Sequence, residues 1–109
     1  ERSNSAAKKA MLYIQENYSK DISLDDVSGL VNISPYYFSK IFKEETGENF
    51  IEYLTKIRIE KAKEFLVKPD ISIKEAGIRS GYTDPNYFSR IFKKQTDMTP
   101  SEYKTRYGE

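Results

Sequence analysis

Apolar side chains recur every three or four residues along almost the whole chain, which is the spacing of a helix with one buried face. No stretch shows the alternation of apolar and polar residues that is typical of a half-buried strand. The first expected helix covers residues 5–18, and its apolar face consists of Ala7, Ala10, Met11, Ile14 and Tyr18. The pattern therefore predicts an all-α protein.

Capping residues mark where the next helices begin. Ser23 and Asp26 have the spacing of a capping box and open a short second helix. We expect this helix to end near Asn32, because asparagine tolerates the left-handed conformation found at helix C-termini. Ser34 and Pro35 then open a third helix with a capping residue followed by proline at the first helical position.

A long helix is expected in the middle of the chain. The third helix ends at Gly47, and Asn49 with Glu52 opens a helix over residues 50–67 that Pro69 terminates. At 1.5 Å per residue this helix is roughly 27 Å long. That length is comparable to the ~34 Å between successive major grooves on one side of B-DNA.

The second half of the chain repeats the signals of the first half. The offset is 49 residues for the short helix and 50 for the longer one, so the second turn has one extra residue, Thr83. The corresponding signals are Ser72 with Glu75 as a second capping box, Gly81 in the place of Asn32, Asp84 with Pro85, and Thr99 with Pro100, Ser101 and Glu102. Seven helices result.

The repetition extends to the residues themselves. The segment YYFSKIFKEETGENFIEY at 36–53 and the segment NYFSRIFKKQTDMTPSEY at 86–103 are identical at nine of eighteen positions. In each half a short helix, a tight turn and a longer helix form a helix-turn-helix pattern, with small Ser28 or Gly77 where the helices pass closely. We therefore expect two helix-turn-helix subdomains, residues 1–48 and 69–109, joined by a connecting helix at 49–68.

The longer helix of each pair has two different faces. One face carries core residues, which are Phe38, Ile41 and Phe42 with Tyr37 at its edge, and Phe88, Ile91 and Phe92 with Tyr87. The other face is polar and contains no acid, and its residues are Tyr36, Ser39, Lys40 and Lys43 in the first copy and Asn86, Ser89, Arg90 and Lys93 in the second. One such face is typical of an ordinary solvated helix. Two of them, each on the second helix of a helix-turn-helix, favour contact with DNA.

Composition narrows the possible functions. The chain has 109 residues, a net charge of +1, no cysteine and no histidine. Without histidine the commonest general base and the commonest zinc ligand are both missing, so we expect no enzyme, no metal and no cofactor. No apolar run is long enough to cross a bilayer, so no membrane is involved, and the lack of cysteine fits a reducing cytoplasm. The polar start at Glu1, without an initiator methionine, indicates a fragment of a longer protein.

The total charge gives little support for DNA binding, but the distribution of cations supports it. Cations that can collect phosphates lie on the two longer helices, where Lys94 adds to the polar face, and on the connecting helix, as Lys56, Arg58, Lys61 and Lys63. We expect the acids to lie mostly elsewhere. Contacts of this kind supply affinity and salt dependence, whereas contacts with base edges supply sequence choice.

These residues resemble the C-terminal DNA-binding domain of AraC/XylS-type bacterial transcription regulators over roughly residues 7–107. The most specific stretch is GYTDPNYFSRIFKK at 81–94 with TPSEY at 99–103, and SPYYFSKIFK at 34–43 resembles its first-half equivalent. The departures are Ser28 and Gly77 where the family usually has alanine, Asp97 where glycine is usual, and Lys104 where arginine is usual. We expect an intact fold with a slightly different helix end at Asp97.

The resemblance implies which residues contact double-stranded DNA. Those implied to face bases are Pro35, Tyr36, Ser39 and Lys40 in the first copy and Pro85, Asn86, Ser89 and Arg90 in the second. Those implied to lie near phosphates are Ser34, Lys43, Asp84, Lys93 and Lys94. By chemistry, Arg90 suits guanine, Asn86 suits adenine, and Tyr36 suits a thymine methyl group or a phosphate. Ser39 and Ser89 either contact bases or only let the helix approach closely.

The resemblance also implies a larger regulator, most often an activator. Its N-terminal sensory or receiver domain would be missing from this sequence, and RNA polymerase would be a partner of the full protein. The alternative is an all-helical protein-interaction module whose polar faces only keep it in solution. An enzyme is the third and least favoured alternative.

Overall fold

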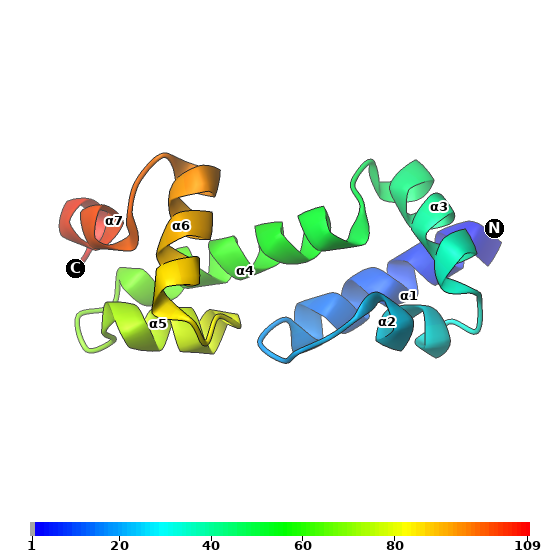
Figure 1. The fold of residues 1–109 in the computed structure, drawn as a ribbon, viewed down its shortest axis with the longest axis horizontal. Helices are drawn as coiled ribbons and strands as arrows, with labels where there is room; N and C mark the ends of the chain where they lie inside the picture. Colours follow the sequence, from blue (N-terminus) through cyan, green and yellow to red (C-terminus); the bar gives the residue numbers. More distant parts are fainter. Residues whose placement is uncertain (1) are drawn as a thin grey trace. The chain divides into compact units, whose positions relative to one another are not determined.

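The computed structural model describes residues 2–109 and contains seven α-helices and no strand in that range (Figure 1). In chain order the helices are α1 (Arg2–Asn17), α2 (Leu24–Leu30), α3 (Pro35–Thr46), α4 (Phe50–Leu66), α5 (Ile73–Ser80), α6 (Pro85–Thr96) and α7 (Pro100–Tyr107). The predicted all-α class and the helix count are confirmed. The first helix begins three residues earlier than expected, and it and the long helix each end one residue earlier.

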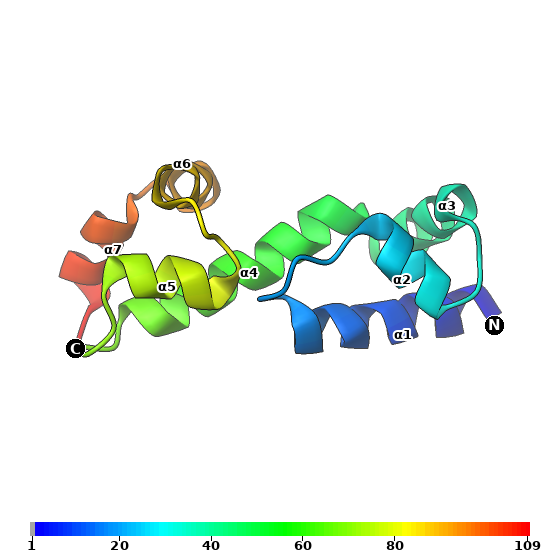
Figure 2. The ribbon, with the colours of Figure 1, turned by 60° about the horizontal axis from the view of Figure 1, so that its bottom comes forward.

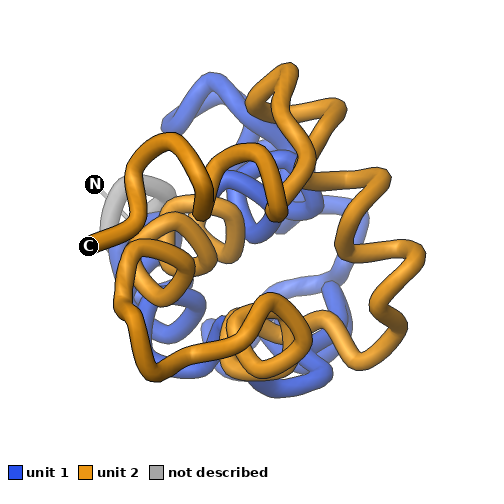
Figure 3. Tube along the Cα trace, turned by 90° about the vertical axis from the view of Figure 1, so that its left-hand side faces the viewer, with its two compact units in different colours: residues 1–56 blue, residues 57–109 orange. Residues whose placement is uncertain are grey.

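The described chain forms two compact units, one up to Lys56 and one from Ile57 onward, coloured separately in Figure 3. The division falls within α4, so that helix supplies residues to both units. In the first unit α1, α2 and α3 pack against one another in pairs, and in the second unit α5, α6 and α7 do the same. Figure 2 shows α6 nearly end-on while α5 runs across the view, so these two helices cross.

Each unit has its own core, built largely from the repeated residues. Phe38, Ile41 and Phe42 are buried in the first unit, with Ile14 and Val27 among their buried companions. The core of the second unit consists of Ile59, Ala62, Leu66, Ile71, Ala76, Tyr82, Phe88 and Phe92. Because the shared phenylalanines are less than 2% exposed, the repeated motif fixes how each longer helix is seated.

Tyr37 and Tyr87 lie at the edge of the core face, as the sequence predicted. They are 48% and 47% exposed, so neither is a fully buried core residue. Ile91, expected in the core, is only partly buried and packs against it. Rings at these two tyrosine positions are therefore surface features with one side against the protein.

Left-handed residues end the helices where the sequence predicted them. Asn32, Gly47, Gly81 and Asp97 have φ values of 60°, 83°, 109° and 64°. Asp97 thus takes the conformation that glycine adopts at the equivalent turn, at some energetic cost. Thr46 and Thr96 make the same hydrogen bonds in both halves, since each hydroxyl donates to a carbonyl four residues earlier at 2.8 Å.

Gly77 lies where α5 passes closest to α6. A β-carbon at this position would lie 2.8 Å from Cδ2 of Phe88, a ring that is 1% exposed. That distance is shorter than real carbon contacts, so the prediction that a small residue is required here is confirmed for Gly77. Ser28, its counterpart, is also buried.

Of the two predicted capping boxes, the first forms fully, since Ser23 and Asp26 exchange two hydrogen bonds. Asn49 with Glu52 and Thr99 with Glu102, predicted only as helix starts, exchange two hydrogen bonds in the same way. At the second predicted box, Ser72 Oγ accepts from the Glu75 backbone N–H at 3.0 Å, but the Glu75 carboxylate pairs with Arg79. The second-half box expected at Ser72 is therefore only half formed.

A lysine of α7 links this helix to the end of α4 and to the loop that follows it. Lys104 Nζ donates to the carbonyl oxygens of Leu66 at 3.0 Å, Lys68 at 2.8 Å and Ile71 at 2.8 Å. These carbonyls lie at the end of α4 and in the loop after it, where no further helical turn can satisfy them. None of the helices in the described part of the chain is long and apolar enough to span a bilayer.

Candidate nucleic-acid interface

The N-terminus of α3 presents the first set of predicted DNA contacts. Ser34 caps the helix by accepting the Tyr37 backbone N–H at 3.2 Å, and Pro35 occupies the first turn. Tyr36, directly after it, is 83% exposed, the most exposed of the large apolar side chains described. Lys40 follows one turn later and is exposed. A helix seated on its phenylalanines thus offers its first turns to solvent.

The N-terminus of α6 is arranged in the same way with different side chains. Asp84 Oδ1 accepts the backbone N–H groups of Asn86 at 2.9 Å and of Tyr87 at 3.3 Å. Asn86 and Arg90 are exposed, as are the other predicted contacts of this copy, Asp84, Pro85, Lys93 and Lys94. The cap therefore fixes the direction in which this first turn points.

Ser39 and Ser89 differ from the other predicted contacts because they are only partly exposed. Ser39 also lines a groove of about 450 Å³ with Ile22, Ser23, Leu24, Asn49, Phe50 and Ile51. A small, half-buried hydroxyl in the middle of the polar face of α3 or α6 leaves room for a binding partner to come close to the helix. Direct base contact by these two serines stays a prediction.

Acids lie near several cations, contrary to the expectation that they would lie elsewhere. On α4, Lys56 pairs with Glu48 at 2.7 Å, Lys61 with Glu64 at 3.8 Å and Lys63 with Glu60 at 3.0 Å. The expectation is therefore wrong for the lysines of the connecting helix. It failed for Lys61 and Lys63 because residues three positions apart on a helix are neighbours, whereas Glu48 reaches Lys56 from the turn before α4.

On α3, the phosphate candidate Lys43 also has an acid nearby, but the ion pair is weak. Lys43 Nζ lies 3.8 Å from Glu52, and both side chains are more than half exposed. Exposed pairs of this kind contribute at most about 1 kcal/mol and exchange partners easily. The remaining connector cation, Arg58, lies over the ring of Tyr82, 5.5 Å from its centre.

Hydrogen bonds shift the pKa of two exposed groups. The hydrogen bond that Lys56 Nζ donates to the Glu48 carboxylate raises the pKa of Lys56. Thr99 lowers the pKa of Glu102 because its backbone N–H donates to the carboxylate, with Lys93 adding a smaller effect. The first bond ties Lys56 to an acid, and the second stabilises the start of α7.

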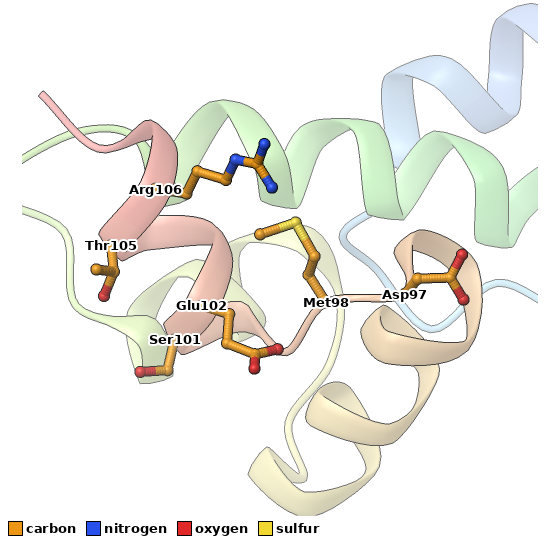
Figure 4. Close-up of a pocket in the computed structure, with 6 residues that line it drawn as sticks. All are labelled: Asp97, Met98, Ser101, Glu102, Thr105 and Arg106. Atoms are coloured by element: carbon orange, nitrogen blue, oxygen red, sulfur yellow. The ribbon is translucent and has the colours of Figure 1, made fainter.

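A second groove, of about 480 Å³, lies where α6 leads into α7 (Figure 4). Met98 sits between Asp97 at the end of α6 and Arg106 on α7, and Ser101, Glu102 and Thr105 complete the lining. None of the predicted DNA contacts is among these residues. No cluster of three potential metal ligands exists among residues 2–109.

Comparison with known proteins identifies the family to which the chain belongs. A family model described as a helix-turn-helix domain matches residues 27–106, most of the chain. The regulatory protein PocR of Salmonella typhimurium is 36% identical over 106 residues, which cover 97% of this chain. The chain belongs to the AraC-type helix-turn-helix family. The family predicted from the repeated motif is thus confirmed.

Solved structures share the fold of this AraC-type domain. The C-terminal domain of AraT, a response regulator from Geobacillus stearothermophilus, has a TM-score of 0.91 at 39% identity, covering 95% of this chain and 87% of that one. The DNA-binding domain of AdpA, solved with a target DNA, has a TM-score of 0.87 at 21% identity, covering 93% and 91%. The second likeness shows the fold alone.

Relatives are longer than this chain. It spans 35% of the length of PocR and 37% of the lactose operon transcription activator of Staphylococcus xylosus, to which it is 35% identical over 95% of its own length. PocR and the Staphylococcus activator are both regulators by name.

One contact at the candidate interface was missed from the sequence. The guanidinium carbon of Arg90 lies 5.9 Å from the centre of the Tyr87 ring. Their spacing of three residues on a helix could have indicated it.

Proposed function

We propose that this AraC-type domain is the part of a bacterial transcription activator that binds a specific double-stranded DNA sequence, with α3 and α6 in neighbouring major grooves. The observation that carries the proposal is the repeated exposed polar face, which stands on a buried frame of identical phenylalanines in both copies. A recognition helix needs this combination, because its base contacts depend on a fixed seating.

The residues divide into base-reading and phosphate-binding groups. Arg90 reads guanine and Asn86 reads adenine through paired hydrogen bonds, and Tyr36 and Lys40 occupy the corresponding places in the first copy. Ser39, Ser89, Pro35 and Pro85 line the base-facing side. Lys43, Lys93, Lys94 and Ser34 bind phosphates.

Asp84 has a particular place in this scheme. A carboxylate repels phosphate, and its Oδ1 already accepts two backbone amides. We therefore assign Asp84 to the phosphate side only indirectly, through the orientation of the first turn of α6, whose N-terminal partial charge attracts phosphate.

The full protein extends beyond this domain. Since this chain spans only 35% of the length of PocR, a sensory or receiver domain precedes the DNA-binding part in our proposal, and the activated complex includes RNA polymerase. It acts in the cytoplasm, where its DNA is. No enzymatic activity is proposed, because the family and fold are those of DNA-binding regulators.

Selection of bound duplexes from a random library, followed by titration at several salt concentrations, tests the proposal. We expect one enriched sequence and a linear fall of log K with log salt, with a slope set by the number of phosphates neutralised. A protein-interaction module would enrich no sequence and give a flat salt dependence, which would overturn the proposal.

A further inference from the structure

Arg90 is in contact with a row of aromatic rings that leads into the core. Its guanidinium carbon lies 5.9 Å from the centre of the Tyr87 ring. The Tyr87 ring lies 5.8 Å from that of Tyr82, and the Tyr82 ring lies 5.6 Å from that of Phe88. On the same Tyr82 ring, Arg58 of α4 is placed at 5.5 Å.

The rings of this row become more deeply buried toward its inner end. Tyr87 is 47% exposed, Tyr82 is 6% exposed and Phe88 is 1% exposed. A ring anchored in the core holds the half-exposed ring beside it, and that ring presents one surface to the arginine. The arrangement restricts a side chain that would otherwise sample many rotamers.

We propose that Tyr87 is a positioning residue that holds Arg90 ready for its base, with Tyr82 as its support. A cation within about 6 Å of an aromatic ring centre is attracted by the ring, and the planar guanidinium also stacks on it. A side chain that is already oriented loses less freedom when it binds, so the gain appears as tighter and more selective binding. This inference rests on the proposed function, because it concerns how Arg90 reads DNA.

The first copy is built differently at the same positions. Its counterpart of Tyr82 is Ile33, and its counterpart of Arg90 is Lys40. An aliphatic residue cannot stack on a ring in the same way, and lysine carries a compact charge on a flexible stem. Positioning by an aromatic row is therefore a property of the second helix-turn-helix, where it sharpens base choice.

Variants of Tyr87 test the inference, with a matched control in the first copy. Tyr87→Leu removes the ring, whereas Tyr87→Phe keeps the ring and removes only the hydroxyl. Tyr37→Leu is the control, since Tyr37 is the equivalent residue and has nearly the same exposure. Thermal unfolding establishes that all three variants fold, which we expect because both tyrosines are half exposed.

The first measurement needs no DNA. In proton NMR spectra of the free domain, ring currents shift the side-chain signals of Arg90, and we expect this shift to be lost in Tyr87→Leu and retained in Tyr87→Phe and Tyr37→Leu. An unchanged Arg90 spectrum in Tyr87→Leu would overturn the positioning role, whatever the DNA measurements give.

The second measurement is selectivity at the base pair whose preference Arg90→Ala relaxes. We expect Tyr87→Leu to lower selectivity there about two- to fivefold, the effect of an exposed cation–ring contact, and Tyr87→Phe to restore it. Equal losses in Tyr87→Leu and Tyr87→Phe would instead assign the effect to the hydroxyl, for example as a phosphate contact, and uniform weakening of all sequences would also contradict the inference. If the wild-type domain selected no sequence at all, the proposed function would fail, while the spectra of Arg90 would still decide the contact.

Discussion

At the scale of the residue, α3 and α6 differ at few positions of their exposed faces. Tyr36 and Asn86 are equivalent, as are Lys40 and Arg90, while the serine and the lysine that complete each face are the same in both. Identical positions would make the same contacts in both copies. Under the proposed function, the differing positions are therefore the ones expected to give the two copies different base preferences.

Arg90→Ala is the most direct test of a single base reader. Removing a bidentate guanidinium costs about 1–3 kcal/mol of discrimination, so we expect the preference at one base pair of the site to disappear. Lys43→Ala is the control, because loss of a phosphate contact weakens all sequences about equally and lowers the salt slope by about 1. Both variants are compared by competition binding with a set of single-base site variants. A uniform loss in Arg90→Ala, with the selected sequence unchanged, would disprove its assignment as a reader.

Gly77→Ala tests the close approach of α5 to α6. The new methyl group would lie 2.8 Å from the buried Phe88 ring, and overpacking of this kind costs about 1–3 kcal/mol, partly offset by the better helix propensity of alanine. We expect a net loss of about 1 kcal/mol in urea unfolding. Gly29→Ala is the matched control in α2, where nothing lies within 4 Å, and it should stabilise by about 0.5–1 kcal/mol. Stabilisation by both substitutions would show that Phe88 yields without cost.

At the scale of the element, local signals were sufficient for the helices but not for the contacts between distant segments. Ser34, Gly47 and Thr99 act on residues within one turn, so their roles could be predicted. Lys104 acts on carbonyls 33–38 residues away, and no local pattern indicates such a contact. The salt bridges of α4 were missed although their spacing was visible, because the cations were counted apart from the acids beside them.

The same limit applies to the candidate interface. The exposed face of each longer helix followed from helical periodicity, because Phe38 and Phe88 fix which side is buried. The edge positions of Tyr37 and Tyr87 also followed, because both lie at the boundary of the apolar arc. Which ring then contacts Tyr82 depends on how α6 crosses α5, and that is a tertiary property.

Glu102→Gln tests the cap of α7 through its dependence on pH. The bond from the Thr99 backbone lowers the pKa of Glu102 in the folded protein, so the unfolded state binds the proton more tightly. The stabilisation is therefore complete above the ordinary glutamate value, about 4.3, and is lost as the pH falls through the lowered folded value. We expect stability to fall less steeply below that pH in Glu102→Gln, which keeps an acceptor without the charge. A carboxyl NMR titration of Glu102 with a midpoint at or above the ordinary value would contradict this.

Lys104→Met tests how much the hydrogen bonds of Lys104 stabilise the second unit. The variant keeps an apolar stem of similar length but removes all three hydrogen bonds to the end of α4 and the following loop. Bonds from a charged donor contribute about 1.5–3 kcal/mol, so we expect a loss of about 2 kcal/mol and faster amide exchange around residues 68–71. Lys74→Met, an exposed lysine on α5, is the control and should change stability little. Equal stability of the two variants would show that water replaces the ammonium at these carbonyls.

At the scale of the whole molecule, the proposed function gives one chain two base-reading helices that are similar but not equal. A homodimer with one reading helix per subunit binds a palindrome because its symmetry is reflected in the DNA. Here the two copies are covalently joined and differ at Tyr36 against Asn86 and at Lys40 against Arg90, so no symmetry relates their base contacts. The selected site should therefore consist of two unlike half-sites.

Exchanging the two differing residues between α3 and α6 tests whether they cause the difference between the half-sites. In the double variant Asn86→Tyr with Arg90→Lys, the exposed face of α6 acquires the residues of α3, because Ser89 and Lys93 already match their counterparts. If these residues choose the bases, the half-site read by α6 changes toward the one read by α3, while the other half-site stays the same. The reciprocal variant, Tyr36→Asn with Lys40→Arg, should change only the opposite half. Site selection with both variants checks this, and an unchanged asymmetric site in both would mean that sequence choice resides outside these faces, in the shape of the DNA or in contacts from other helices.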